Sequence, residues 1–312
     1  MQKLISALCV LLLLAGCAGR KEQSITVAQQ YGTAYAPIAV MRELALLEQE
    51  LPDSVTVKWV QLANTAAIRE SMLAGKTDFA CMAIPPFLIG RDAGMEWQIC
   101  SGVSRVPMGL TTSDPTLTSL ADITPDMRIA LPQPGSIQHI LLAMAASREL
   151  GEARRFDDQL VTLSHPDGMN ALLSGGEVSL HFTTSPYLQQ EQQAGMTLLL
   201  DGEEAMGQPY TGIVAVAGQS LYHENPKVYQ AFLKALEEAI RWIQENPQEA
   251  AQLLAPLYGM EPDALLQEMT APGAAYTTEV AGVEAFERFM LEEGYLKADH
   301  SLDTLLFSEA VR

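Results

Sequence analysis

The sequence predicts an α/β protein of two lobes, each a mostly parallel sheet flanked by helices. Three observations support this fold class: short apolar strands alternate with amphipathic helices, the alternation occurs in two separate stretches, and the two stretches share a recurring segment. Alternation of strand and helix is typical of parallel sheets with helices on their faces. The 312 residues are enough for two such lobes.

The first stretch of alternation covers residues 25–84. Strands are expected at 25–28, 55–62 and 79–84, and helices at 37–51 and 65–73. Asn64 or Thr65 is suited to the N-cap of the second helix, and Gly75 to its end. Pro85 and Pro86 are expected to stop the third strand. This order of elements predicts a parallel sheet.

The second stretch repeats the pattern over residues 128–182. Strands are expected at 128–131, 160–163 and 178–182, and helices at 138–150 and 168–173. The segment from Leu73 that leads to Pro85-Pro86 resembles the segment from Leu173 that leads to Ser185-Pro186, about 100 residues later. The repeat predicts two similar lobes whose loops lie at corresponding places. A strand at 213–217 and further helices follow.

The N-terminus indicates export and anchoring. Lys3 precedes the apolar run Leu4–Leu14, which is too short to span a bilayer and is typical of a signal peptide. The run ends in Leu-Ala-Gly-Cys17, which resembles the lipobox of bacterial lipoproteins. The resemblance implies a signal peptide at 1–16, a lipid on Cys17 and a lipidated tether at 17–23. An ordinary signal peptide with an incidental cysteine is the alternative.

Composition excludes several classes of function. The chain carries 19 basic and 38 acidic residues, a formal net charge of −19. This argues against nucleic-acid binding, which needs basic patches, and indicates an acidic, solvated surface. Beyond the leader and Cys17, only Cys81 and Cys100 remain, and we expect free thiols rather than a bridge. The five histidines are scattered, so neither a metal site nor a cofactor is expected.

Three features together resemble a known family. They are the segment Gly75–Ala83, the pair Gly135-Ser136 opening a helix that carries His139, and the helix starts Asn225-Pro226 and Asn246-Pro247. Their order resembles the ABC-importer solute-binding proteins for nitrate, sulfonates, taurine and thiamine-precursor pyrimidines, over about Ile25–Tyr295. The resemblance implies a type II periplasmic-binding fold. It also implies an extracytoplasmic, lipid-anchored monomer that works with an ABC permease and its ATPase.

The resemblance also implies where the lobes begin and end. Lobe 1 is expected at 24–111 plus 212–312, and lobe 2 at 112–211. The crossovers are expected near Thr111–Thr116 and Gln208–Gly212. The expected ligand is a small organic anion such as a sulfonate, taurine or nitrate, or alternatively a pyrimidine.

Candidate ligand-binding residues follow the expected strands, because ligands of open α/β sheets bind beyond the carboxyl ends of the strands. The candidates are Tyr31, Gly32, Tyr35, Asn64, Thr65, Pro85, Gly135, Ser136, Gln138, His139, Thr184, Tyr187, Tyr210 and Thr211.

Gly135 and Ser136 stand out because glycine lets the backbone approach a ligand, and the following helix offers free N–H groups to an anion. Ser136 could instead only cap its helix, and His139 could be a packed core histidine. The four candidate tyrosines could wall the pocket. Arg105 could face an anion or form a surface ion pair.

Two rival functions come from other classes. Enzymes of the same fold include desulfinases with a cysteine nucleophile and menaquinone-pathway enzymes, and here Cys81 with His139 or His181 would have to serve. Cys81 lies in an apolar strand, where burial raises the pKa of a thiol and makes it inert. We therefore expect no catalytic residue. The second rival is a surface lipoprotein that binds a protein partner.

Overall fold

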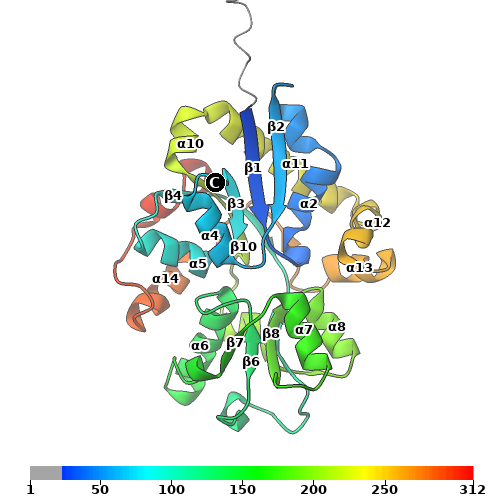
Figure 1. Cartoon of the computed structure of the whole chain (residues 1–312), viewed down its shortest axis with the longest axis vertical. Coiled ribbons are helices and arrows are strands. Elements are labelled where there is room, and N and C mark those ends of the chain that lie inside the picture. The colour runs from blue at the N-terminus through cyan, green and yellow to red at the C-terminus, as the bar shows by residue number, and fades with distance from the viewer. Residues whose placement is uncertain (1–22, 312) are drawn as a thin grey trace, which may run out of the picture.

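Two sheets, one in each lobe, organise the chain (Figure 1). The computed structural model describes residues 23–311. One sheet has six strands in the order β11–β4–β10–β3–β1–β2, and the other has five in the order β7–β6–β8–β5–β9. The predicted α/β fold of two lobes is confirmed. The expected signal peptide, Cys17 and all of the tether except Gln23 lie outside the described residues.

The first lobe contains the N-terminal and C-terminal parts of the chain. Its strands are β1 (Gln23–Gln29), β2 (Val55–Gln61), β3 (Phe79–Met82), β4 (Trp97–Arg105), β10 (Ile213–Gly218) and β11 (Ala275–Tyr276). Its α-helices are α2 (Ala36–Glu43), α3 (Leu46–Glu50), α4 (Thr65–Leu73), α5 (Ile84–Asp92), α10 (Gln219–Glu224), α11 (Pro226–Glu245), α12 (Pro247–Tyr258), α13 (Pro262–Met269), α14 (Val283–Glu292) and α15 (Leu302–Leu305). The 3-10 turns η1 (Thr33–Tyr35) and η4 (Ser308–Val311) complete it.

The second lobe is formed by the middle of the chain. Its strands are β5 (Met108–Thr112), β6 (Ile129–Leu131), β7 (Leu160–Thr162), β8 (Leu180–Thr184) and β9 (Thr197–Asp201). Its helices are α6 (Ile137–Leu150), α7 (His165–Leu173), α8 (Tyr187–Gln193) and α9 (Gly202–Met206), with 3-10 turns η2 (Leu120–Asp122) and η3 (Asp157–Gln159). No helix between residues 23 and 311 combines the length and the apolarity that a membrane span requires.

The two lobes share one topology. The strand order β2–β1–β3–β10–β4 of the first corresponds to β7–β6–β8–β5–β9 of the second, with β10 and β5 antiparallel to their neighbours. Helices α4 and α7 occupy equivalent places and each has 9 residues. Each is capped by the side chain before it, Asn64 or Ser164, and each is followed by a glycine with positive φ, Gly75 or Gly175. The repeat seen in the sequence is therefore a structural repeat.

The first crossover lies earlier than expected. Strand β5 pairs with β8 and β9 of the second sheet, so residues 108–111 belong to lobe 2 rather than lobe 1. The chain changes lobes at Val106-Pro107, between β4 and β5, and not at Thr111–Thr116. The two strands are separated by only two residues, Val106 and Pro107, so no loop of the usual length marks the crossover in the sequence. The return crossover runs from the end of α9 to β10.

Two expected elements also differ. The helix expected at 37–51 is interrupted at Ala45, whose φ of 50° is left-handed, and continues as α3. Pro85 and Pro86 do not end a strand in a loop but lie in the first turn of α5, which the sequence did not predict. Proline is tolerated there because the N–H groups of a first turn have no partner within the helix.

A buried carboxyl group holds α8 on the second sheet. Glu191 of α8 is fully buried, and its Oε1 lies 2.5 Å from Nδ1 of His181 on β8. The hydroxyl of Thr111 on β5 donates to the other carboxylate oxygen at 2.5 Å. The carboxylate therefore depends on two strands for its hydrogen bonds. Cys81 and Cys100 are both buried and free, as expected.

We predict that Glu191→Ala lowers the free energy of unfolding by about 3–5 kcal/mol, because it leaves His181 and Thr111 without their partner in the core. Urea denaturation of the purified protein measures this. Glu177→Ala, on the exposed loop before β8, is the matched control and should change stability by less than about 0.5 kcal/mol. If Glu191→Ala lowered the free energy of unfolding no more than Glu177→Ala does, the hydrogen bonds of Glu191 would not stabilise the fold as predicted.

Candidate functional site

A small cavity of about 40 Å³ lies between the lobes. The loops that follow strands of both sheets and the two crossovers line it, which is where ligands bind in open α/β sheets. None of its lining residues carries a formal charge at neutral pH. They are Gln30, Tyr31, Ala34, Tyr35, Thr65, Ala83, Pro86, Val106, Met108, Pro132, Ser136, Ile137, Gln138, His165, Thr184, Gly212 and Ile213.

The structure brings six of the candidate residues together in this cavity: Tyr31, Tyr35, Thr65, Ser136, Gln138 and Thr184. Six further candidates do not line the cavity but are next to a lining residue in the sequence or in contact with one. They are Gly32, Asn64, Pro85, Gly135, His139 and Tyr187. Sequence reasoning missed His165, which also lines the cavity. His165 could have been found from the repeat, because it is the first residue of α7 as Thr65 is of α4.

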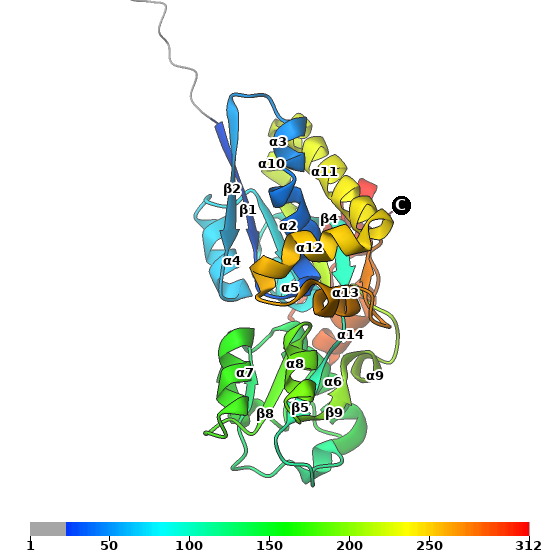
Figure 2. The ribbon, with the colours of Figure 1, turned by 90° about the vertical axis from the view of Figure 1, so that its right-hand side faces the viewer.

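The equivalent helices α4 and α7 begin at the cavity from opposite lobes. In Figure 2, α4 lies above α7 on the side of the molecule away from α9 and α14. Thr65 and His165 are both buried and both line the cavity. The amide of Gln30 donates to the Thr65 hydroxyl at 2.9 Å. Two helix N-termini, each with a partial positive charge, thus face the same small space.

The N-terminus of helix α6 is the third helix N-terminus at the cavity. Gln133-Pro134-Gly135-Ser136 form a turn closed by a 3.1 Å bond from Ser136 N–H to the Gln133 carbonyl, and Gly135 has a φ of +79°. Proline followed by a left-handed glycine is typical of a type II turn. Ser136 caps the helix by accepting from the His139 N–H at 3.3 Å. The N–H groups of Ile137 and Gln138, which line the cavity, have no partner among residues 23–311.

Gly135 uses its own N–H within the protein. That N–H donates to Nδ1 of His139 at 2.9 Å. A Cβ at this position would lie 2.6 Å from Cδ1 of Ile89 in α5. Glycine is needed here for the turn and for the close approach of the two lobes.

His139 is packed within the protein, as one of the two alternatives for this residue expected. Since Nδ1 accepts from a backbone N–H, the ring proton is on Nε2, which donates to Asp157 at 3.0 Å. The ring also meets Tyr295 edge-on, at a centroid distance of 5.5 Å. Both ring nitrogens of His139 are hydrogen-bonded within the protein. The bond from the Gly135 N–H to Nδ1 fixes the turn that contains Gly135.

His165 presents a neutral imidazole to the cavity. Its Nε2 lies 3.4 Å from the Gln138 amide, its Nδ1 lies 3.4 Å from the Thr183 hydroxyl, and its ring stacks on Tyr187. Burial, with a smaller contribution from nearby His181, lowers the pKa of His165 to about 3. The residue therefore serves as a hydrogen-bonding group and not as a cation.

The four tyrosines do not form one wall. Tyr31 and Tyr35 line the cavity, and Tyr187 supports it from behind His165. Burial raises the pKa of Tyr187 to about 12, so its hydroxyl stays protonated. Tyr210 and Thr211 do not line this cavity but line a separate groove, whereas the next residue of the return crossover, Gly212, lines the cavity.

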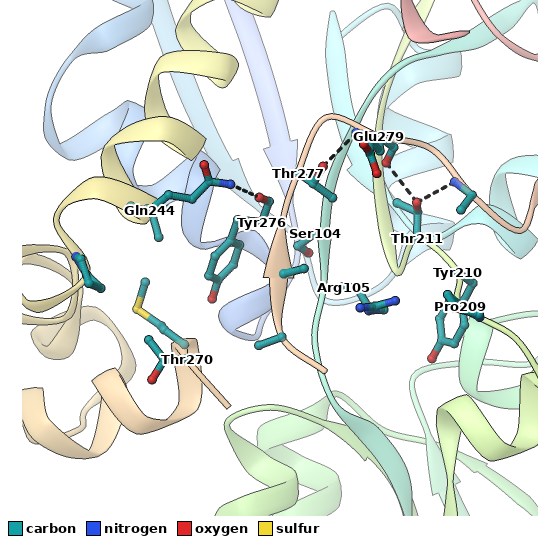
Figure 3. Close-up of a pocket in the computed structure, with 16 residues that line it drawn as sticks. Ser104, Arg105, Pro209, Tyr210, Thr211, Gln244, Thr270, Tyr276, Thr277 and Glu279 are labelled. Carbon is teal, nitrogen blue, oxygen red and sulfur yellow. Dashed lines mark hydrogen bonds between the residues drawn. The ribbon is translucent and has the colours of Figure 1, made fainter. Parts of the chain in front are cut away.

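The groove that contains Tyr210 and Thr211 is larger than the cavity, at about 640 Å³, and lies open beside β11 (Figure 3). Thr211 is committed to the protein there, since its hydroxyl donates to the Glu279 carbonyl at 3.2 Å and accepts from Ala281 N–H at 2.9 Å. Arg105 forms an ion pair with Glu203, with Nε and Oε1 3.3 Å apart, as the surface-pair alternative expected. Among residues 23–311, no three His, Cys, Asp or Glu side chains gather as metal ligands.

The lobes touch on both sides of the cavity. Thr33 N–H donates to the Ser185 carbonyl at 3.1 Å, and Ala66 N–H donates to Oε1 of Gln133 at 2.9 Å. Gly32 has a φ of +113°, and a Cβ there would lie 3.1 Å from the Ser185 carbonyl oxygen. These contacts hold the two lobes against each other beside the cavity.

Comparison with known proteins identifies the family. Residues 18–257, well over half of the chain, match the model of the NMT1-like family. The chain belongs to the NMT1-like family. A Bacillus subtilis (strain 168) protein named as an aliphatic sulfonates-binding protein is 23% identical to this family member over 268 residues, 83% of this chain and 79% of that protein.

Solved structures share the fold of this NMT1-like chain. The alkanesulfonate-binding protein of Xanthomonas axonopodis pv. citri, bound to MOPS, superposes with a TM-score of 0.75 at 20% identity, covering 93% of this chain and 98% of that one. The periplasmic nitrate-binding protein of Synechocystis PCC 6803 gives 0.69 at 16% identity, covering 91% and 84%.

We predict that His165→Gln makes the protein less sensitive to acid. The unfolded chain binds a proton at a pKa of about 6.5, whereas folded His165 does so only at about 3. Its contribution to stability is therefore complete above about pH 6.5 and is lost as the pH falls toward 3. The unfolding midpoint should drop less between pH 7 and pH 4 in the variant than in the wild type. Exposed His223→Gln is the control, and parallel curves for wild type and His165→Gln would contradict the prediction.

Proposed function

We propose that this protein is the solute-binding component of an ABC importer and captures a small organic anion, such as a sulfonate, taurine or nitrate, between its lobes. The observation that carries the proposal is the uncharged interlobe cavity at which helices α4, α6 and α7 begin. Helix N-termini bind anions through free N–H groups without a basic side chain.

The chemistry of the lining supports an anion over a cation. The donors at hand are the N–H groups of Ile137 and Gln138, the Gln138 amide and the Thr65 hydroxyl, and no carboxylate lines the cavity. Tyr31, Met108 and Ile213 add apolar surface for the organic part of a ligand. The names of the Bacillus subtilis and Xanthomonas relatives agree with this chemistry.

A binding role rather than catalysis fits the thiols. Cys81 lies in β3 and Cys100 in β4, both buried away from the cavity. Burial raises the pKa of both thiols well above its usual range, so neither supplies a thiolate nucleophile. His139 and His181, the partners that a cysteine enzyme would need, are bonded to Asp157 and Glu191 instead.

We place the protein outside the cytoplasm, anchored by lipid on Cys17, acting as a monomer with a permease and its ATPase. The leader at 1–16 and the Leu-Ala-Gly-Cys17 sequence motivate this placement. Two or more acyl chains give stable anchoring, and one alone would give only reversible binding.

We predict that an alkanesulfonate, taurine or nitrate stabilises the mature protein by about 2.7 kcal/mol at a ligand concentration 100-fold above its dissociation constant. Thr65→Val, which removes one hydroxyl from the cavity, should weaken that ligand about tenfold, as expected for a hydrogen bond to a charged group. Thermal unfolding and calorimetric titration measure the two effects.

Thr197→Val, on the exposed edge of β9, is the matched control and should bind as the wild type does. Stabilisation by a pyrimidine and by none of the anions would replace the proposed ligand class. Thr65→Val binding as tightly as the control would remove the cavity from the site.

We also predict that Cys17→Ser releases the protein from the membrane fraction or blocks its maturation, because the acylated thiol is lost. Fractionation of cells expressing the two forms tests this. Persistent membrane association of mature Cys17→Ser protein would contradict lipid anchoring, while leaving the binding proposal untouched.

A further inference from the structure

One hydrogen bond joins the start of a helix in one lobe to a side chain of the other. The side chain of Gln133, in the loop after β6, accepts from the N–H of Ala66, the second residue of α4, at 2.9 Å. Gln133 is 8% exposed and does not line the cavity. It lies beside the site and touches the opposite lobe.

The bond completes the cap of α4. The first N–H groups of a helix have no partner within it. Asn64 satisfies the N–H of Ala67 at 3.0 Å from within lobe 1, and Gln133 satisfies that of Ala66 from lobe 2. When the lobes separate, Ala66 loses this partner, so the bond belongs to the closed arrangement alone.

The equivalent helix of the second lobe, α7, has no counterpart of the bond from the Ala66 N–H to Gln133. Pro166 occupies in α7 the place that Ala66 occupies in α4, second in the helix, and proline has no N–H to donate. The comparison also shows that this kind of helix start accommodates proline at its second position. The chain thus provides a precedent for removing the donor without disturbing the helix.

Gln133 is also tied to the binding loop. Its carbonyl accepts from the N–H of Ser136, a cavity residue, and closes the turn that places the start of α6. Its backbone therefore positions one lobe's donors while its side chain holds the other lobe.

We propose that Gln133 is a closure latch: by capping α4 from the opposite lobe, it holds the lobes together over the bound solute. The inference builds on the proposed solute-binding function. A bond that forms only after closure should slow release of the solute and leave its capture unchanged. Gln133 is thus a positioning residue, since it does not line the cavity.

The test uses Gln133→Ala, which removes the acceptor, Ala66→Pro, which removes the donor, and the double variant. The probe is the alkanesulfonate, taurine or nitrate that stabilises the wild type. Each single variant should raise the dissociation rate about three- to ten-fold, the range for one hydrogen bond, with an unchanged association rate. The double variant should be no faster than either single one, because all three lack the same bond. Gln49→Ala, whose amide bonds only to Leu44 within lobe 1, is the control.

A dissociation rate that stays at the wild-type value in Gln133→Ala, or multiplies in the double variant, would overturn the latch. A wild type that binds none of the probes would instead defeat the proposed function. The latch is then tested without ligand, from the distance between spin labels on Glu70→Cys and Glu177→Cys. A shift toward longer distances in both latch variants supports it, and unchanged distances refute it.

Discussion

The facing carboxyl ends of the parallel strands in two mixed sheets are the constraint on which the rest of the structure depends. Each lobe orders its strands in the same way, so the helices that follow β2 and β7 start at the same kind of edge. Because the two edges face each other, the starts of α4 and α7 meet across the cavity with Thr65 and His165 at their tips. The position of the site follows from this topology, and the lining residues only set its chemistry.

The acidic chain keeps its interlobe cavity free of formal charge. A carboxylate in the cavity would repel an anion, and a buried cation would have to be desolvated each time the lobes close. The cavity uses backbone N–H groups, amides and hydroxyls instead, and His165 is kept neutral by its burial. Fixed dipoles of this kind need little reorganisation when a charged solute arrives. The basic group near the hinge, Arg105, is neutralised by Glu203 outside the cavity.

Much of this arrangement could be predicted from the sequence, because local signals agree with the fold. The helix cap at Asn64, the glycines after α4 and α7 and the alternation of elements gave the lobes and six residues of the cavity. The first crossover could not be predicted, since only two residues separate β4 from β5 and only strand pairing assigns the two strands to different sheets. The roles of Gly135 and His139 do not follow from the local sequence, because a turn residue and a first-turn histidine look alike whether they face a ligand or each other. The interlobe bond of Gln133 could not be predicted from the sequence either, because its partner Ala66 lies 67 residues away in the chain.

The account makes one claim above all, that the solute binds in the small uncharged cavity and not in the larger groove that contains Arg105. A crystal structure of the mature protein grown with a stabilising sulfonate tests it most directly. The account predicts that the acid group lies between the lobes, within hydrogen-bond distance of Thr65 and of the first N–H groups of α6, with the lobes closed around it. A sulfonate in the groove beside Arg105 and Tyr210, with the interlobe cavity unchanged, would contradict it.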